Sequence, residues 1–492
     1  MAALNIQRTK IFLRPDSSRV FFRPFDMPNK ERLIRVLARV MAMSERAVKE
    51  EADRMLRRFV ERHQKLREHL LERFETVQSE LITDRLPSES RKLLIGAYLT
   101  LEYSLEAAAL FNPSVVAHPD QTNVPAGSLR LVLSLRATGE GHLSSIVFRT
   151  AEITNTGRLT INSPTPFVTA TAPYPNASYE KRLFERKLVE LGLLDEFAAS
   201  LLRELEDTFT LEQLKHCIDR GLRRGRFSTR DHQLNTTRGM LALAQSNYEL
   251  RFDPSSRLSE RVIFPNTPAE SRGIEDARWV MFRDDDGSVT YYATYSAYDG
   301  RIVLPQVVET TDFINFRIST LNGPEIVNKG LALFPRKING RYAMISRQDG
   351  ENLYIMFSEL LHFWYEKHLL LRPTEPWEFI QIGNCGSPIE TDEGWLVLTH
   401  GVGAMRRYVL GAVLLDLENP TRVIGRLREP LLTPTERERE GYVPNVVYSC
   451  GSIIHEGILL IPYAMSDQST TFATVPLRDL LSELKNHPPS AV

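Results

Sequence analysis

The chain has 492 residues, 42% of them hydrophobic and 25% charged, and its 61 Lys and Arg nearly balance its 62 Asp and Glu. This is the composition of a globular protein too long for one small core, so we expect more than one structural unit. A net charge of −1 creates no long-range field for nucleic acid or an anionic membrane, so any anion site must come from a local group of cations.

Helical periodicity dominates residues 29–110. From Leu33 onward, apolar residues recur at three- and four-residue steps while charged residues fill the other faces. A Pro-Ser pair interrupts the pattern, and Ser88 is a suitable N-cap for a further helix that we expect to run to about Leu110. We therefore predict an N-terminal helical region over residues 1–110.

Short β-rich runs follow the helical region. Residues 129–135 and 145–149 are rich in β-branched and apolar side chains, with glycines between them. Helical periodicity then returns over residues 178–247, where Thr210 and Gln213 have the spacing of a capping box. We therefore predict strands interrupted by a helical insertion.

The rest of the chain, from residue 248 to 478, is strand-rich and carries a glycine-containing turn signal after each short run. Residues 289–295 and 395–399 are examples of the predicted strands. Many short strands without intervening helices predict a sandwich, a barrel or a propeller. No repeat of about 40–50 residues is visible, so periodicity alone does not select the propeller. We place the β domain at residues 111–478 and a tail at 479–492.

The cysteines and the N-terminal residues predict the cellular compartment of the protein. The three cysteines lie far apart without a C-x-x-C pair, which argues against a disulfide framework and a structural zinc site. The first residues lack the apolar core of a signal peptide, and no apolar run approaches the ~20 residues of a membrane span. We expect a cytoplasmic protein with no metal, membrane or nucleic-acid partner.

The most informative segment is 271–280, in which Glu275 and Asp276 lie between Arg272 and Arg278 just before a predicted strand. Neighbouring residues of a strand point to opposite faces. We therefore expect one carboxylate to face a cavity and the other to pair with an arginine in the wall. As a bare pattern, the segment fits a surface salt-bridge cluster better than an active site.

A second segment, 328–347, predicts a strand, a hairpin turn at Asn339 and Gly340, and another strand. Lys329 and Arg347 place cations at its two ends. By themselves these charges fit a solvated hairpin.

Further polar residues follow predicted strands elsewhere. His400 begins a glycine-flanked loop, and Arg136 precedes a flexible polar loop that contains His142 and Ser144. Each of these residues, taken alone, is as well explained by a structural role.

Taken together, the segments resemble glycoside hydrolase family 130, the mannoside phosphorylases and related β-mannosidases. Residues 273–278, Gly-Ile-Glu-Asp-Ala-Arg, are similar to the family's Gly-x-Glu-Asp-Pro-Arg segment, with Ala277 where many members have Pro. Six further segments match in the family's order: 297–300, 333–342, 400–402, 410–417, 420–425 and 443–448. The resemblance covers about 110–175 and 248–478.

The resemblance implies a mainly β fold, a five-bladed β-propeller, to which the N-terminal helical region and the helical insertion are additions. It implies an inverting phosphorylase in which Asp276 is the sole catalytic carboxylate and donates its proton through a sugar hydroxyl. Inorganic phosphate is the co-substrate, and no cofactor is expected. The implied phosphate-binding residues are Arg136, Lys329, Arg347 and His400. The implied sugar contacts are Asp299, His142, Ser144, Arg278 and Asn112.

The substrate class and the alternatives also follow from the resemblance. The helical additions and the segment Ser-Arg-Gly-Ile-Glu-Asp are most similar to those of members acting on β-1,2-linked oligomannosides. The implied product is α-mannose 1-phosphate. A homo-oligomer is expected. The first alternative is an inverting β-mannosidase, which needs a base such as Glu440 to activate water. The second is a non-catalytic carbohydrate-binding propeller.

Overall fold

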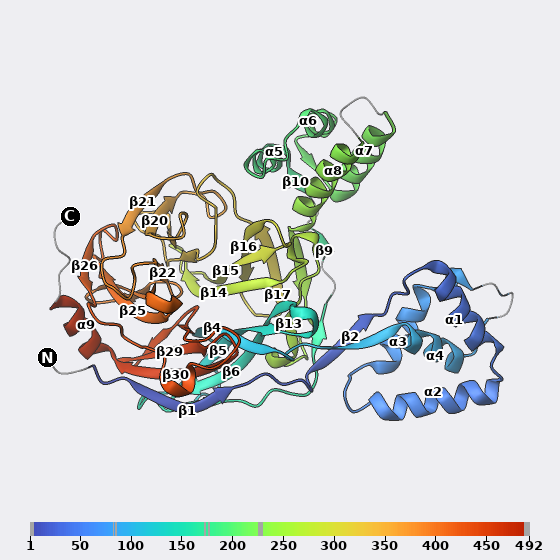
Figure 1. Cartoon of the computed structure of the whole chain (residues 1–492), viewed down its shortest axis with the longest axis horizontal. Helices are drawn as coiled ribbons and strands as arrows, with labels where there is room; N and C mark the ends of the chain where they lie inside the picture. The colour runs from blue at the N-terminus through green and yellow to red at the C-terminus, as the bar shows by residue number, and fades with distance from the viewer. Residues whose placement is uncertain are drawn as a thin grey trace.

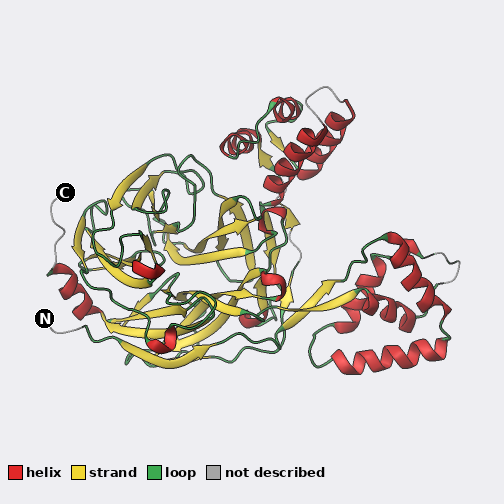
Figure 2. Ribbon diagram, viewed as in Figure 1, coloured by secondary structure: helices red, strands yellow, loops and turns green. Residues whose placement is uncertain are grey.

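The structure, a computed structural model, describes residues 4–81, 83, 86–171, 174–175, 178–224 and 230–486. The protein is mainly β, with a large body of sheets from which two groups of helices project (Figures 1 and 2). None of the described helices is long and apolar enough to cross a membrane.

The first helical group has its own apolar core. It contains α1 (Lys30–Ala42), α2 (Glu45–Phe59), α3 (Leu66–Glu75) and α4 (Glu89–Tyr98). The apolar faces of these amphipathic helices pack together through residues such as Leu37, Val48 and Leu94. The predicted cap is confirmed, because the Ser88 side chain accepts a hydrogen bond from the Arg91 amide.

A two-stranded ribbon joins this helical group to the body (Figure 1). It pairs β2 (Val20–Pro24) with β3 (Thr100–Ser104). The prediction of helix as far as Leu110 is therefore wrong. Pairing with β2 satisfies the backbone of the β-prone residues after Leu99, and this tertiary contact outweighs the helical pattern.

The second helical group is the predicted insertion. It contains α5 (Lys181–Glu190), α6 (Glu196–Arg203), α7 (Leu211–Arg224) and α8 (Arg230–Gln245), with the short strands β10 (Tyr179–Glu180) and β11 (Thr208–Phe209). The predicted capping box is confirmed: the Thr210 amide donates to Gln213 Oε1 at 2.8 Å, and the Gln213 amide donates to Thr210 Oγ1 at 3.2 Å.

Five sheets of four to six strands form the body within the described residues. Sheet 1 contains β4 (Ala109–Ala117), β5 (Leu129–Thr138), β6 (Ser144–Ile153), β7 (Leu159–Ile161), β8 (Thr169–Ala170) and β13 (Arg261–Ile263). Sheet 2 contains β9 (Tyr174–Pro175), β12 (Tyr248–Arg251), β14 (Ile274–Arg283), β15 (Val289–Tyr298), β16 (Val303–Thr310) and β17 (Asn315–Thr320).

The other three sheets follow in chain order. Sheet 3 contains β18 (Ala332–Leu333), β19 (Tyr342–Ser346), β20 (Leu353–Ser358) and β21 (Lys367–Leu371). Sheet 4 contains β22 (Gln381–Asn384), β23 (Ile389–Thr391), β24 (Gly394–Val402), β25 (Tyr408–Leu415) and β26 (Val423–Arg426). Sheet 5 contains β27 (Val447–Tyr448), β28 (Ile453–His455), β29 (Ile458–Met465), β30 (Ser469–Pro476) and β1 (Gln7–Leu13). A last helix, α9 (Leu477–Lys485), lies against β25 and β26.

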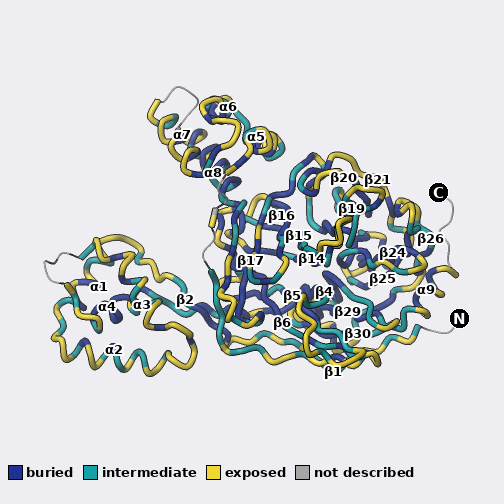
Figure 3. The backbone as a smooth tube through the Cα atoms, turned by 180° about the vertical axis from the view of Figure 1, so that it is seen from behind, coloured by how far each residue is buried: buried dark blue, intermediate teal, exposed yellow. Residues whose placement is uncertain are grey.

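Each sheet packs against the next one. β4 contacts β14, β14 and β15 contact β18, β19 and β20 contact β22, and β25 contacts β27. β29 of the last sheet contacts β4 of the first. A separate apolar cluster fills each of these five interfaces, and the buried backbone is concentrated there (Figure 3). Burial of these interfaces is therefore the main stabilising contribution to the body.

A buried group of charges lies where the ribbon meets sheet 1. Glu106 is fully buried between two buried arginines: Arg19 Nε lies 2.9 Å from its Oε1, and Arg149 Nη2 lies 2.7 Å and 2.9 Å from its two oxygens. Burial and the neighbouring Arg149 charge lower the pKa of Arg19. The Arg19 guanidinium also donates to the Thr165 and Ser259 carbonyls, so this group fastens the ribbon to the body.

We predict that Glu106→Gln lowers the free energy of unfolding by about 3–5 kcal/mol, because it keeps the side-chain shape but leaves two buried guanidinium groups without a counter-charge. Urea unfolding followed by circular dichroism measures this loss. Glu31→Gln is the control, since Glu31 is exposed and its ion pair with the exposed Arg35, at 3.8 Å, contributes little to stability. An equal effect of the two substitutions contradicts the prediction.

Candidate functional site

A pocket of about 310 Å³ is lined by segments of all five sheets. Its lining residues are Phe111, Asn112, Arg136, Glu275, Asp276, Lys329, Arg347, Gln381, His400, Arg406, Tyr408, Val443, Val446, Tyr448 and Asp467. Seven of the residues singled out from the sequence meet here: Asn112, Arg136, Glu275, Asp276, Lys329, Arg347 and His400. The pocket is therefore the candidate active site.

A bulge in β14 brings both carboxylates of the motif into the pocket. The register of β14 against β15 shifts between Glu275 and Arg278, and Asp276 has a left-handed backbone with φ +57°. Both carboxylates line the pocket, so the expectation of opposite faces is wrong, because a bulge interrupts the alternation of a regular strand. The expectation that one of them pairs with an arginine is confirmed by Glu275 and Arg136. The alternation of residues in the sequence does not predict a bulge.

Arg278 does not belong to the pocket lining, although its guanidinium group lies close to Asp276. Its side chain is only 2% exposed. Nη1 donates to the Asp276 carbonyl at 3.0 Å, Nη2 donates to the Tyr448 hydroxyl at 2.5 Å, and Nη2 lies 3.7 Å from Asp276 Oδ2. Arg278 therefore holds the bulge against β27, which is a supporting position and not that of a direct sugar contact.

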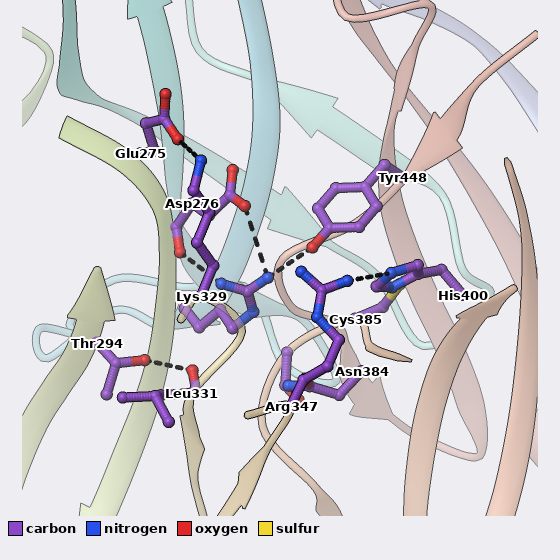
Figure 4. Close-up of polar contacts among 12 residues, drawn as sticks. Glu275, Asp276, Thr294, Lys329, Leu331, Arg347, Asn384, Cys385, His400 and Tyr448 are labelled. Atoms are coloured by element: carbon purple, nitrogen blue, oxygen red, sulfur yellow. Dashed lines mark hydrogen bonds and ion pairs between the residues drawn. The ribbon is translucent and has the colours of Figure 1, made fainter. Parts of the chain in front are cut away.

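Glu275 connects two of the predicted phosphate-binding cations, of which Figure 4 shows Lys329. Its Oε1 accepts a hydrogen bond from Arg136 Nη2 at 2.9 Å, and its Oε2 is paired with Lys329 Nζ. Arg136 also lies over the Phe111 ring, with its guanidinium carbon 4.9 Å from the ring centroid. The carboxylate therefore ties sheets 1 and 3 to sheet 2 and fixes both cations at the pocket.

Arg347 and His400 lie together on the opposite side of the pocket (Figure 4), where Arg347 Nη1 is 3.3 Å from His400 Nε2. The Gln381 amide links them: it donates to the Gly350 carbonyl at 3.1 Å and accepts from Arg347 Nη1 and from His400 Nε2. Burial, with the charge of Arg347, lowers the pKa of His400 well below its usual value. His400 is therefore a neutral hydrogen-bonding group at pH 7, not one of the cations.

The remaining predicted sugar contacts lie outside the pocket lining. Ser144 is fully buried and donates to the Ile274 carbonyl at 3.0 Å. Asp299 accepts from the Arg301 and Ile302 amides in the turn after β15, and His142 is exposed. The structure does not place these three side chains in the pocket lining; Ser144 is bonded to the backbone of β14 and Asp299 to the backbone of its own turn. Glu440, the base of the hydrolase alternative, is also exposed and outside the lining.

Three polar lining residues were missed from the sequence: Gln381, Arg406 and Asp467. Asp467 follows β29 with a left-handed backbone, φ +52°. Burial, and then the negative charge of Asp276, raise the pKa of Asp467 to about 6. None of these residues belongs to a recognisable motif; the only signal for Asp467 is its place in a short Ser-Asp turn between two predicted strands.

Several buried polar atoms at the pocket have no hydrogen-bond partner among the residues that the structure describes. They include the Oδ1 of Asn112, which is 5% exposed, and the Nε atoms of Arg136 and Arg347. Buried polar atoms in native structures are nearly always hydrogen-bonded, to protein, water or a ligand. An acceptor on one side and guanidinium donors around it fit a ligand that carries both hydroxyl groups and negative charge.

Comparison with known proteins agrees with this chemistry. Residues 232–486 match the model of glycoside hydrolase family 130, described as β-1,4-mannooligosaccharide phosphorylase. The 1,2-β-oligomannan phosphorylase of Thermoanaerobacter sp. (strain X514) is 37% identical over 232 residues, 46% of this chain and 75% of the relative. The β-1,2-mannobiose phosphorylase of Listeria innocua is 35% identical over 232 residues, 45% of this chain and 63% of the relative. A solved complex of that Listeria enzyme with β-1,2-mannobiose covers 78% of this chain and 94% of its own, with 24% identity and a TM-score of 0.46.

We predict that Asp467→Asn raises the melting temperature by roughly 2 °C at pH 8. The pKa of Asp467 is raised in the folded protein from 3.8 to about 6, so its contribution to stability is full below pH 4 and is lost as the pH rises through 6. The gain should therefore shrink towards zero at pH 4. Asp285→Asn, at an exposed position, is the control in a thermal scan; a gain that does not depend on pH contradicts the prediction.

Proposed function

Since the chain belongs to glycoside hydrolase family 130, we propose that it cleaves β-mannosides with inorganic phosphate, with inversion, to release α-mannose 1-phosphate. The observation that carries the proposal is the convergence of Arg136, Lys329 and Arg347 on the pocket that contains Asp276. Guanidinium and ammonium groups hold phosphate through charge-assisted hydrogen bonds. Because phosphate is already an anionic nucleophile, it needs no carboxylate base of the kind that activates water.

The pocket has room and chemistry for both reactants. Arg347 and the neutral His400 form a donor-rich side that suits phosphate, and Lys329 adds a cation from across the pocket. Asn112 Oδ1, Asp276 and Asp467 offer acceptors for sugar hydroxyl groups. We therefore infer that the mannosyl group binds between these two sides, with phosphate attacking C1 from the donor-rich side and Asp276 providing the proton for the leaving oxygen through a sugar hydroxyl.

The proposal includes a β-1,2-linked oligomannoside as the substrate, which the two named relatives at 35–37% identity favour.

The proposal also includes a five-bladed propeller. Five sheets in chain order, each packed on the next and the last packed on the first, support this architecture. A homo-oligomer acting in the cytoplasm completes the proposal; the oligomer derives from the resemblance, and the cytoplasmic location from the sparse cysteines without a C-x-x-C pair.

Hydrolysis is the competing outcome. An inverting hydrolase places its base about 6.5–9.5 Å from its acid, with water between them. Glu440 is exposed and outside the pocket lining, and Glu275 is engaged with Arg136 and Lys329. Phosphorolysis, which needs no carboxylate base, therefore fits the positions of Glu440 and Glu275 better than hydrolysis does.

We predict that β-1,2-mannobiose yields mannose 1-phosphate only when inorganic phosphate is added, as measured by anion-exchange chromatography of the products. Asp276→Asn should lower kcat by at least about 100-fold, because it removes the proton donor and keeps its shape. Free mannose released at equal rates with and without phosphate would instead establish a hydrolase.

We predict that Arg347→Ala raises the KM for phosphate by about 10- to 100-fold, since a charge-assisted hydrogen bond contributes about 1.5–3 kcal/mol, and changes the KM for the mannoside far less. Initial rates over a grid of both substrates separate the two constants. Arg336→Ala is the control, because Arg336 pairs with the exposed Glu390 away from the pocket. Equal increases in both KM values would remove Arg347 from phosphate binding.

A further inference from the structure

Two large apolar side chains are exposed at the edge of the pocket. Met405 is 92% exposed and Tyr442 is 74% exposed. Each of them directly precedes a residue of the pocket lining, Arg406 and Val443 respectively. Consecutive Cα atoms are about 3.8 Å apart, so both side chains begin within one residue of the site. Single apolar residues are common on a protein surface, whereas apolar surface gathered beside a binding site marks a contact with a ligand or a partner.

The Tyr442 ring reaches towards sheet 1. Its centroid lies 6.0 Å from that of the His142 ring, and the two ring planes are inclined by 31°. The Val443 amide donates to the Ser466 carbonyl at 3.0 Å. Gly441 permits a similarly close approach, since a Cβ atom there would lie 2.6 Å from the Ser466 carbonyl oxygen. The backbone on both sides of Tyr442 is therefore fastened to the turn after β29, and the exposed ring is held in place.

The loop that carries His142 is fastened in turn to the N-terminal ribbon. The Tyr103 hydroxyl of β3 donates to the Glu140 carbonyl at 3.1 Å. A Cβ atom at Gly139 would lie 2.4 Å from the Ser104 carbonyl oxygen, so β3 and this loop are in close contact. The ribbon therefore positions the loop against which the Tyr442 ring lies.

Met405 lies at the tip of the hairpin between β24 and β25. The Gly403 amide donates to the Arg407 carbonyl at 3.0 Å, which closes the hairpin. Met405 and Arg406 both have left-handed backbones, with φ of +57° and +53°. Among residues other than glycine, this conformation favours Asn and Asp, so backbone preference does not account for an apolar side chain at the tip. An unbranched thioether side chain does suit a surface that adapts to a ligand.

The segments that carry Met405 and Tyr442 are joined at the wall of the pocket. Tyr408 of β25 forms a parallel bridge with Val446, and the Tyr408 amide donates to the Asn445 carbonyl at 3.1 Å. Tyr408 and Val446 both line the pocket. The two exposed side chains therefore belong to neighbouring segments that leave the same part of the lining.

The position of these side chains identifies what covers them. The pocket, at about 310 Å³, is at the lower end of the volumes of small-molecule sites, and it has to hold phosphate beside the two mannosyl units at the cleaved bond. Further units of an oligomannoside therefore lie outside the pocket. A second copy of the chain seated on Met405 and Tyr442 would compete with these units for the edge of the pocket, so the position favours the substrate.

We propose that Met405 and Tyr442 form an apolar rim that binds the mannosyl units beyond the cleaved disaccharide and gives the protein a preference for longer β-mannosides. The inference rests on the proposed function and adds the part of the site that selects chain length. A pyranose ring has C–H groups on its faces and hydroxyl groups around its edge. Packing of a face on the Tyr442 ring and the Met405 thioether removes apolar surface from water, while Arg406 supplies donors for the hydroxyl groups.

The test compares initial rates on β-1,2-mannobiose and β-1,2-mannotriose at saturating phosphate. The ratio of kcat/KM for mannotriose to that for mannobiose should fall about 5- to 20-fold in Tyr442→Ala, because burial against an aromatic ring is lost. In Met405→Asn, whose new residue suits the left-handed backbone, it should fall about 3-fold. Tyr442→Phe keeps the ring and should keep the ratio of the wild type. Tyr98→Ala, at an exposed position in α4, is the matched control and should not change the ratio.

Calorimetric titration with mannotriose in the Asp276→Asn background separates this inference from the proposed function, since it needs no turnover. A lower affinity for mannotriose when Tyr442→Ala is added supports the apolar rim, even if the wild type releases free mannose and is a hydrolase. An unchanged ratio together with an unchanged affinity would overturn the inference. Sedimentation of Tyr442→Ala gives the other decisive result: a smaller assembly with an unchanged ratio would make the apolar rim a contact between subunits and overturn the inference as well.

Discussion

The pocket depends on the bulge in β14 that the buried Arg278 holds in place. A guanidinium group has donors in a fixed planar arrangement, and here it joins the Asp276 carbonyl on sheet 2 to the Tyr448 hydroxyl on sheet 5. Without the bulge, Glu275 and Asp276 would alternate across the strand, and only one of them would reach the pocket. The left-handed backbone at Asp276 is therefore a local cost that the surrounding hydrogen bonds offset.

Because both carboxylates of the bulge reach the pocket, positive and negative side chains nearly balance in its lining. The lining has four cationic side chains, Arg136, Lys329, Arg347 and Arg406, and three carboxyl groups, Glu275, Asp276 and Asp467, while His400 stays neutral. The ion pairs of Glu275 with Arg136 and Lys329 are made across sheets, so these charges also hold the sheets together. A dianionic ligand thus enters a site whose cations are already positioned, which lowers the entropic cost of binding.

Much of the fold was predictable, because strands, caps and hairpin turns have local signals. Ser88 and the Thr210–Gln213 pair were identified by their capping chemistry, and Asn339 and Gly340 both adopt the positive φ values of a tight hairpin turn. The end of the N-terminal helices was predicted wrongly, because pairing of β3 with β2 is a contact between segments about 80 residues apart. Similarly, six residues that line the pocket were expected from the resemblance to the family, while Gln381, Arg406 and Asp467 reach the pocket only through the packing of the sheets.

The pairing of β1 with β30 has a consequence for biosynthesis. The hydrogen bond from Thr471 Oγ1 to the Ile11 carbonyl spans 460 positions of sequence, so β1 leaves the ribosome long before its partner exists. Until the last strand is made, sheet 5 is incomplete and β1 has unpaired backbone groups of the kind that recruit strands from other chains. Closure of so long a loop is slow relative to local folding. Completion of sheet 5 must therefore wait until β30 has been made, and in that interval the edge of β1 is open to aggregation.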